Sequence, residues 1–269
     1  MFFQFLLLCE SRSKPQYPAR TLRQTLKLTF CQEPLHSVNW LRERPIAHRC
    51  LHNPDAGSYE NTLSAARAAI QKNYAIEVDL QPSADCVPMV FHDYQTKRMT
   101  GRDANTRELT AAELSKLRIR ETKDTIPTLQ QLLEVVDSKV GLVLELKGHL
   151  PSDNGFVAAV AKQLDGYEGH VAIMSFAHHL LQDGRKLAPH LPLGLTAEGD
   201  DRHYETHRDI SIETNVDFVS YHVEGLETRF AKEFRQTGRP MISWTIRTEE
   251  AVEYCYQHCD QPTFECIEV

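Results

Sequence analysis

Three acidic residues stand inside short apolar runs of the sequence, where a charge is costly to bury. Glu77 and Asp79 are two residues apart in one run, so their side chains point to the same side of a strand. Glu145 stands in a second, strongly apolar run. Buried carboxylates need a partner, and oxygen ligands suit a hard divalent cation such as Mg²⁺ or Ca²⁺. Alternatively, each carboxylate pairs with a neighbouring base such as Arg49 or Lys147.

Two histidines follow other apolar runs and are candidates for proton transfer. His48 directly follows the first strand-like run, and His92 follows the third. An imidazole titrates near neutral pH, so it can give or take a proton. A single histidine is more often hydrogen-bonded without any chemistry, but two beside a carboxylate cluster indicate an acid–base pair. Arg49 and Lys147 would supply positive charge for a phosphoryl group.

These residues belong to short β-rich runs that alternate with amphipathic stretches, a pattern typical of βα units and a parallel sheet. The predicted strands are 46, 76–80, 88–91, 141–146, 171–174, 193–196, 217–220 and 241–244. Eight strands with interleaved helices in about 225 residues predict an α/β fold, a (β/α)8 TIM-type barrel. It is irregular between strands 2 and 4, because no helix separates the second and third strands. No glycine-rich phosphate loop follows the first strand, which argues against an open, doubly wound sheet.

The composition limits the classes of partner. Of 269 residues, 41% are hydrophobic and 25% charged, as in ordinary globular proteins. The net charge of −7 would repel the phosphates of nucleic acid, so no nucleic-acid partner is expected. Seven cysteines without the spacing of a disulfide framework predict reduced thiols in a cytoplasmic protein.

The first part of the chain differs from the rest in its hydrophobic periodicity. Residues 1–38 show no sustained periodicity, which predicts a poorly ordered N-terminal extension before a barrel domain at 39–269. The apolar run Met1–Leu8 has no basic residue before it and is too short to span a bilayer. We therefore expect no stable membrane insertion. The sequence does not indicate an oligomeric state.

Taken in order, the motifs resemble those of the glycerophosphodiester phosphodiesterase family. The matching segments are His48-Arg49, Tyr59-Glu60-Asn61-Thr62, Glu77-Val78-Asp79, Val90-Phe91-His92-Asp93, Glu145-Leu146-Lys147 and Ser243-Trp244-Thr245. Each is short, but the ordered set is specific. The resemblance implies an eight-stranded α/β barrel and the hydrolysis of glycerophosphodiesters to sn-glycerol 3-phosphate and an alcohol, a reaction of lipid and glycerol metabolism.

The resemblance also implies a role for each matching residue. The resemblance implies that Glu77, Asp79 and Glu145 bind the metal and that His48 and His92 act as general acid and base. It implies that Arg49, Lys147 and Trp244 bind the substrate, and that Glu60 is a bracing group or an extra ligand. It does not say which histidine is the acid, which alcohol leaves or which metal binds.

Three cysteines depart from the family's pattern. Cys50, Cys86 and Cys266 stand where the family usually has glycine, a residue that supplies a positive φ or a close backbone approach. Two alternatives therefore stay open. One is a catalytically impaired barrel that binds a phosphodiester without cleaving it, because Cys50 lies beside the site residues in sequence. The other is a related phospholipase acting on another phosphodiester, although the short segment 94–125 offers no apolar docking surface.

Overall fold

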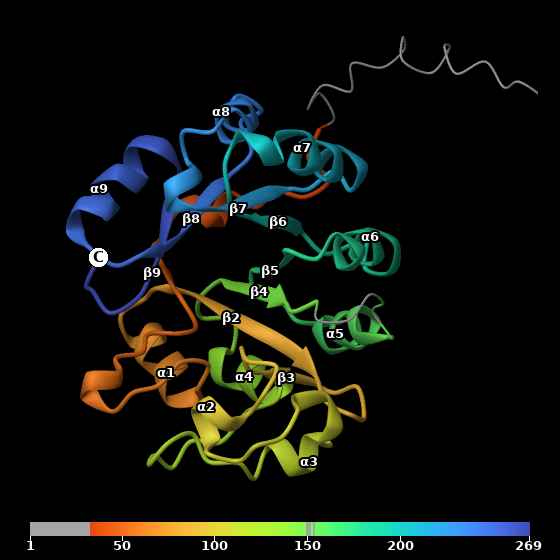
Figure 1. Cartoon of the computed structure of the whole chain (residues 1–269), viewed down its shortest axis with the longest axis vertical. Coiled ribbons are helices and arrows are strands. Elements are labelled where there is room, and N and C mark those ends of the chain that lie inside the picture. Colours follow the sequence, from red (N-terminus) through yellow and green to blue (C-terminus); the bar gives the residue numbers. More distant parts are fainter. Residues whose placement is uncertain (1–32, 149–151, 153) are drawn as a thin grey trace, which may run out of the picture.

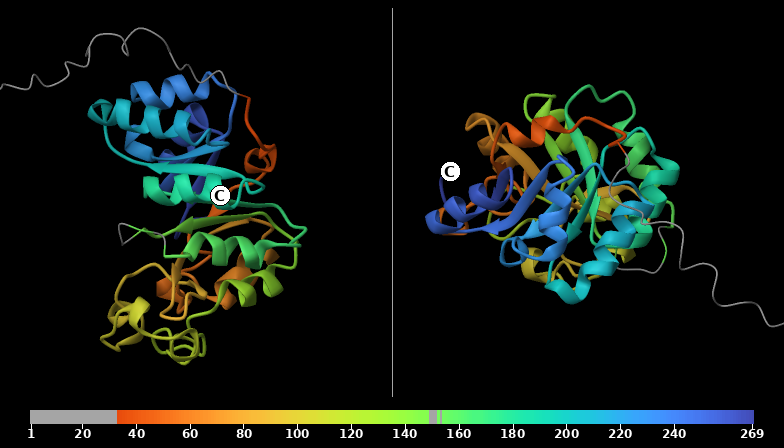
Figure 2. Two further views of the ribbon diagram at one scale, coloured as in Figure 1. Left: turned by 90° about the vertical axis from the view of Figure 1, so that its right-hand side faces the viewer. Right: turned by 90° about the horizontal axis from the view of Figure 1, so that it is seen from above.

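The protein is described by a computed structural model that covers residues 33–148, 152 and 154–269. Parallel strands form a closed ring surrounded by helices (Figures 1 and 2). The strands of the ring are β1 Ile46–Ala47, β2 Ala75–Pro82, β4 Leu142–Leu146, β5 Val171–Ser175, β6 Leu193–Ala197, β7 Phe218–His222, β8 Met241–Ile246 and β9 Gln261–Phe264. The ring closes because β1 pairs with both β2 and β9. The predicted (β/α)8 barrel is thereby confirmed.

The predicted set of strands is wrong at two places. Strand β3 (Pro88–Val90) is not part of the ring but pairs antiparallel with the far end of β2. The long β2 continues beyond the rim, and the chain then turns back through β3. This return places the Phe91 N–H 2.9 Å from the Asp79 carbonyl oxygen, so the next residue, His92, reaches the level of the rim. The eighth strand of the ring is β9, which was not predicted.

The described helices are α1 Leu63–Gln71, α2 Lys97–Thr100, α3 Ala111–Leu114, α4 Leu129–Val136, α5 Phe156–Leu164, α6 His178–Leu187, α7 Tyr204–Glu213, α8 Arg229–Arg235 and α9 Glu249–His258. Five of the nine described helices, α1, α3, α4, α8 and α9, begin at a threonine side-chain cap. The Thr62 side chain accepts a hydrogen bond from the Ala65 N–H at the start of α1. A capping box of Thr128 and Gln131 starts α4. Such caps satisfy backbone donors that a helix leaves open at its start.

Hydrophobic packing closes one end of the barrel and leaves the other for polar groups. Trp40, Leu41 and Ile46 belong to a buried cluster inside the ring, together with Phe218 and Ile242. Gly194 leaves room for the Phe218 ring, which a β-carbon at that position would hit. A second cluster fills the space between strands and helices. The polar residues of the ring therefore gather at the carboxyl ends of the strands.

The segment after β3 forms a small core of its own. Met89, Met99 and Leu114 pack together with neighbouring apolar residues, away from the main core. Of the predicted N-terminal extension, residues 1–32 lie outside the described part of the chain, and the domain boundary stays a prediction. Across residues 33–148, 152 and 154–269, each helix is too short or too polar to cross a membrane.

Candidate active site

The three predicted carboxylates meet at the open end of the barrel. Asp79 on β2 lies in register beside Glu145 on β4, and Glu77 is on the same face of β2. One oxygen of each of the three side chains lies within 4.8 Å of the others. All three residues are buried. Strand pairing thus places together acidic groups that are far apart in the sequence.

Two bases share this cluster without neutralising it completely. Lys147 Nζ lies 2.8 Å from Asp79 Oδ1 and 2.5 Å from Glu145 Oε1. Arg49 Nε lies 3.3 Å from Asp79 Oδ2, and the Arg49 backbone N–H donates to Glu77 Oε2. Glu77 Oε1 is buried and has no hydrogen-bond partner among the described residues. Burial raises the pKa of Glu77 well above its usual range, and the charges of Asp79 and Glu145 act in the same direction.

This donor set fits a hard divalent cation. Carboxylate oxygens are the ligands that Mg²⁺ and Ca²⁺ prefer. The buried Glu77 Oε1 offers a lone pair to which no described residue donates, and an added positive charge would stabilise the ionised form of Glu77. Glu77, Asp79 and Glu145 are therefore the residues that could hold a metal.

His48 is held by a carboxylate that sequence reasoning missed. Its Nδ1 lies 2.5 Å from Glu265 Oε2, directly after β9. Glu265 also contacts Arg247, at 2.6 Å. Burial lowers the pKa of His48, and the hydrogen bond to Glu265 opposes this effect. The omission follows from the missed strand: the short β9 contains Pro262, and a proline weakens any strand pattern in the sequence.

His92 belongs to a second network of polar contacts. Its Nδ1 lies 2.8 Å from Asp93 Oδ1. Arg98, at α2, contacts both Asp93 and Glu60, at 2.5 and 2.6 Å. Glu60 also lies 3.1 Å from Arg49. Glu60 therefore braces the two arginines and stands outside the carboxylate cluster.

Arg98 and Asn61 make further polar contacts around the site, and sequence reasoning gave neither residue a role there. Asn61 Nδ2 donates to Asp79 Oδ2 at 2.8 Å, and Asn61 stands in a motif that resembles the family's. Arg98 lies in the aperiodic segment after β3, so no strand or helix pattern marked it. Asn61 thus holds Asp79, and Arg98 holds the carboxylates that contact His92 and Arg49.

A cavity of about 140 Å³ lies between these groups and the other side of the barrel. Its lining residues are His48, Arg49, Glu77, His92, Glu145, Lys147, Met174, Phe176, Thr196, Ser220, Trp244 and Thr263. Trp244 is held by its indole N–H, which donates to the Ser220 carbonyl oxygen at 3.3 Å. The Phe176 ring meets the Trp244 ring edge-on at 5.4 Å. One side of the cavity is thus charged, and the other carries aromatic rings and hydroxyl groups.

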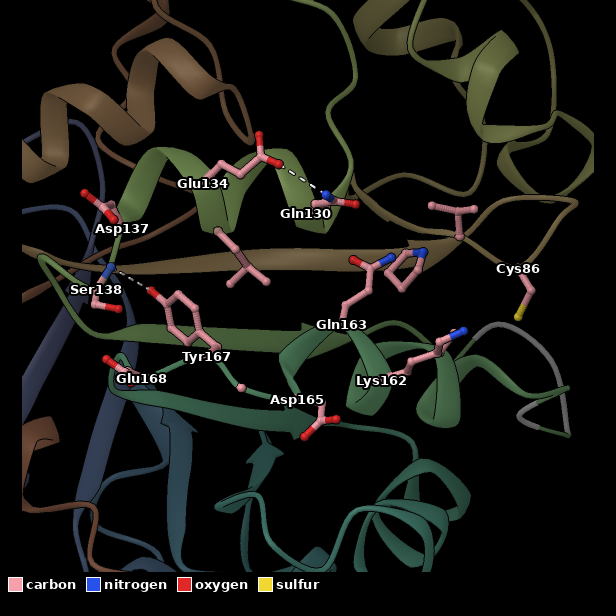
Figure 3. Close-up of a pocket in the computed structure, with 15 residues that line it drawn as sticks. Cys86, Gln130, Glu134, Asp137, Ser138, Lys162, Gln163, Asp165, Tyr167 and Glu168 are labelled. Atoms are coloured by element: carbon pink, nitrogen blue, oxygen red, sulfur yellow. Dashed lines mark hydrogen bonds between the residues drawn. The ribbon is translucent and has the colours of Figure 1, made fainter.

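A larger hollow elsewhere lacks this chemistry. A groove of about 780 Å³ runs between α4 and α5 on the outside of the barrel (Figure 3). Its lining includes Glu134, Lys162 and Tyr167, whose hydroxyl accepts a hydrogen bond from the Ser138 N–H (Figure 3). The predicted site residues lie elsewhere, so volume alone does not identify the site.

The three cysteines that replace glycine all have left-handed backbone conformations. The φ angles are +70° at Cys50, +59° at Cys86 and +59° at Cys266. The Cys50 side chain is buried in the hydrophobic core with Ala47 and Ala65, and it does not line the cavity. Burial raises the pKa of its thiol well above the usual range. Cys50 therefore neither crowds the cavity nor has the low pKa of a reactive thiol.

Comparisons with known proteins show similarity to glycerophosphodiester phosphodiesterases. The glycerophosphodiester phosphodiesterase of Caldanaerobacter subterraneus is 32% identical over 160 residues, which cover 56% of this chain and 65% of that one. Human glycerophosphodiester phosphodiesterase 1 is 22% identical over an alignment of 275 positions, with 85% and 81% covered. A solved phosphodiesterase of Oleispira antarctica, in complex with the product sn-glycerol-3-phosphate, is 24% identical. Its TM-score is 0.74, with 82% of this chain and 92% of that chain covered.

The family assignment rests on the match along most of the chain. The sequence profile of the "Glycerophosphoryl diester phosphodiesterase family" matches residues 47–260. This range contains all nine predicted site residues, from His48 to Trp244, and the fold is that of solved family members. The chain therefore belongs to the glycerophosphoryl diester phosphodiesterase family of enzymes.

Proposed function

We propose that the protein hydrolyses glycerophosphodiesters to sn-glycerol 3-phosphate and an alcohol, in a metal-dependent reaction with His48 and His92 as acid and base. The observation that carries this proposal is the buried carboxylate cluster with two imidazoles lining the same cavity. Glu77, Asp79 and Glu145 would hold the cation, Mg²⁺ or Ca²⁺. When bound, such an ion supplies positive charge to a phosphoryl oxygen.

The chain's own bases would orient the phosphate. Arg49 and Lys147 line the cavity, and both stay charged because neighbouring carboxylates outweigh the effect of burial on their pKa values. A guanidinium and an ammonium group on one wall suit a phosphodiester anion. Trp244, on the opposite side, would cover the carbon atoms of the substrate.

The two imidazoles are held in the same way. Each has a carboxylate oxygen at Nδ1, from Glu265 for His48 and from Asp93 for His92. A carboxylate at Nδ1 favours a proton on that nitrogen and leaves Nε2 for the substrate. One imidazole then takes a proton from the attacking hydroxyl or water, and the other gives a proton to the oxygen of the leaving alcohol.

The compartment of the reaction is part of the same proposal. Cys50, Cys255, Cys259 and Cys266 carry thiols that form no disulfide in the described part of the chain. Such thiols support a reducing compartment, and we propose the cytoplasm.

A hydrolysis assay tests the proposal. The purified chain is incubated with glycerophosphocholine in the presence of Mg²⁺, Ca²⁺ or a chelator, and released choline is measured. We expect turnover with a metal and none with the chelator. Glu77→Gln should lose activity, whereas Glu134→Gln in the groove between α4 and α5 should not. Turnover that survives the chelator would refute metal dependence, and binding without turnover would favour the impaired barrel.

A further inference from the structure

One arginine outside the cavity joins two carboxylates of the site. Arg98, on α2, donates to both side-chain oxygens of Asp93 and to both of Glu60. Its Nε and Nη2 lie 2.5 and 2.9 Å from Asp93 Oδ2 and Oδ1, and its Nη1 and Nη2 lie 3.0 and 2.6 Å from Glu60 Oε2 and Oε1. Two bidentate pairs use the planar fork of a guanidinium, which a lysine ammonium cannot reproduce. Arg98 is not among the described residues that line the cavity, so we do not expect it to touch the substrate.

The two carboxylates in turn contact side chains that line the cavity. Asp93 Oδ1 lies 2.8 Å from His92 Nδ1, and Glu60 Oε1 lies 3.1 Å from Arg49 Nη1. Burial would raise the pKa of both carboxyl groups, but hydrogen bonds outweigh it and lower both pKa values. These bonds come from Arg98 at Glu60, and from His92 and Arg98 at Asp93. Both carboxylates are therefore ionised at neutral pH, and they share the charge of one guanidinium.

The backbone next to these side chains is fixed by a different residue. Gln81, on β2, is fully buried. Its side-chain amide nitrogen lies 3.2, 2.8 and 2.6 Å from the carbonyl oxygens of Phe91, His92 and Asp93. Loss of Arg98 should therefore release the two carboxylate side chains without moving this part of the main chain.

The segment after β3 holds Arg98 in place through its own small core. The neighbouring residue Met99 is buried in that core. The Thr96 hydroxyl donates to the Arg102 carbonyl oxygen at 2.6 Å, and the Arg120 N–H donates to the Met99 carbonyl oxygen at 2.7 Å. These contacts fix α2 from within the segment, and the position of α2 sets that of the guanidinium.

We propose that Arg98 is a positioning residue that orients the His92 imidazole through Asp93 and the Arg49 guanidinium through Glu60. This inference rests on the proposed function and goes beyond it, because it gives the segment after β3 a part in the reaction without contact to the substrate. Without Arg98, Glu60 would draw Arg49 toward itself, and Asp93 would be free to turn together with His92. A small displacement of such groups is costly, because the reacting atoms must be held in one geometry.

Chemical rescue of a truncated variant tests this proposal. Arg98→Ala removes the guanidinium, and guanidinium chloride is added back at concentrations far below those that unfold proteins. The Arg98 side chain is 43% exposed, so the added ion can reach the vacated position from solvent. Kinetics on glycerophosphocholine are measured with guanidinium, with methylammonium and with sodium chloride at equal ionic strength. Arg229→Ala is the matched control, because Arg229 pairs with Glu233 on α8, outside the ring of strands (Figure 1).

The expected result is a loss of activity that guanidinium reverses. Arg98→Ala should lose about 10²-fold in kcat/KM, with a fall in kcat and a rise in KM, because both the imidazole and the phosphate-binding guanidinium lose their positions. Guanidinium should restore much of this loss and saturate, whereas methylammonium and sodium chloride should not. Arg98→Lys keeps a charge but not the two bidentate pairs, so its activity should lie between those of Arg98→Ala and the wild type. Arg229→Ala should keep the wild-type rate under all conditions.

A mutant cycle measures the coupling between the two carboxylates. Asp93→Asn and Glu60→Gln are made singly and together, with and without Arg98→Ala. With Arg98 present, their effects on kcat/KM should not add, because both residues bind one guanidinium. In the Arg98→Ala background, the two effects should add.

Other results would overturn the inference in distinguishable ways. If the wild type hydrolyses glycerophosphocholine and both Arg98 variants keep its rate, Arg98 does not position the site. A folded Arg98→Ala whose lost activity guanidinium does not restore would show a merely structural role. Should Arg98→Ala fail to fold, Arg98→Lys takes its place in the mutant cycle, and a coupling unchanged from the wild type refutes the inference. If no glycerophosphodiester is hydrolysed at all, the proposed function itself is refuted, and this inference with it.

Discussion

The two sides of the cavity differ in how their buried polar groups are hydrogen-bonded. On the charged side, Lys147, Arg49 and Asn61 all contact Asp79, and Glu265 holds His48. On the other side, the buried hydroxyl groups of Thr196, Ser220 and Thr263, which we call the hydroxyl wall, find no such partners among the described residues. The charged side is therefore organised before any ligand binds, whereas the hydroxyl wall can be satisfied only by what enters the cavity.

The largest effect should come from breaking the charged side. Asp79→Asn removes the carboxylate that both Lys147 and Arg49 contact and that would bind the cation. We expect kcat/KM to fall by about 10³-fold, because a charge aimed at the reacting group contributes most inside a dry site. Steady-state kinetics on glycerophosphocholine measure this loss. Asp165→Asn, in the groove between α4 and α5, should leave the rate unchanged. If Asp79→Asn and the wild type had equal rates, Asp79 would have no role in the reaction.

The next effect is the pH dependence of stability that Glu265 gives the charged side. Burial, the largest influence, would raise the pKa of Glu265, but the hydrogen bond and charge of His48 outweigh it and lower the pKa to about 2. A carboxylate with a lowered pKa in the folded state stabilises the protein above its unfolded pKa, near 4.5. This contribution is lost as the pH falls from 4.5 through about 2, and it amounts to at most about 3 kcal/mol.

Urea unfolding with a chelator at several pH values checks this linkage. Glu265→Gln should be less stable than the wild type at pH 7, and the difference should shrink steadily below pH 4.5. Glu268→Gln is the matched control, since Glu268 is exposed and pairs with exposed Lys72, and a solvent-screened pair of this type contributes little to stability. A difference for Glu265→Gln that stays constant down to pH 3 would show that the charge of Glu265 is not what stabilises the fold.

The charged side was predictable from sequence to a degree that the hydroxyl wall was not. Glu77 and Asp79 are conspicuous because charges are rare in apolar strands, and their spacing of two fixes their common face. A threonine or serine in a strand is ordinary, so nothing in the linear sequence distinguishes Ser220 from Ser243. Only the closed ring shows that one faces the cavity while the other does not.

The errors in the predicted strands have the same origin. Strand β9 depends on its pairing with β1 near the other end of the described chain, and β3 turns back on the adjacent β2 instead of joining the ring. Local periodicity shows neither pairing. His92 was expected beside the carboxylates as the residue after a parallel strand of the ring. It lies there for another reason, because β3 runs back along the end of β2 that extends beyond the rim. Glu265 had no such signal, since β9 is short and contains Pro262.

A smaller effect should separate the hydroxyl wall from ordinary buried hydroxyl groups. Thr196→Val replaces a hydroxyl without a described partner by a methyl group of the same shape, so we expect the free protein to gain about 1 kcal/mol of stability. Thr214→Val is the same change where the buried hydroxyl donates to the Ile210 carbonyl oxygen at 2.7 Å, and it should lose about 1 kcal/mol. Chemical denaturation measures both variants. Equal losses would mean that Thr196 is already satisfied in the free protein.

The smallest effect concerns the backbone at the strand ends of the charged side. Cys266 is exposed and has a φ of +59°, a conformation that disfavours a β-carbon. Cys266→Gly should stabilise the protein by about 0.5 kcal/mol, because relief of this strain exceeds the greater freedom of glycine in the unfolded chain. Cys50→Gly relieves similar strain but removes a buried side chain, so its stability should stay the same or fall. A gain at Cys50 larger than at Cys266 would mean that strain, rather than packing, dominates beside His48.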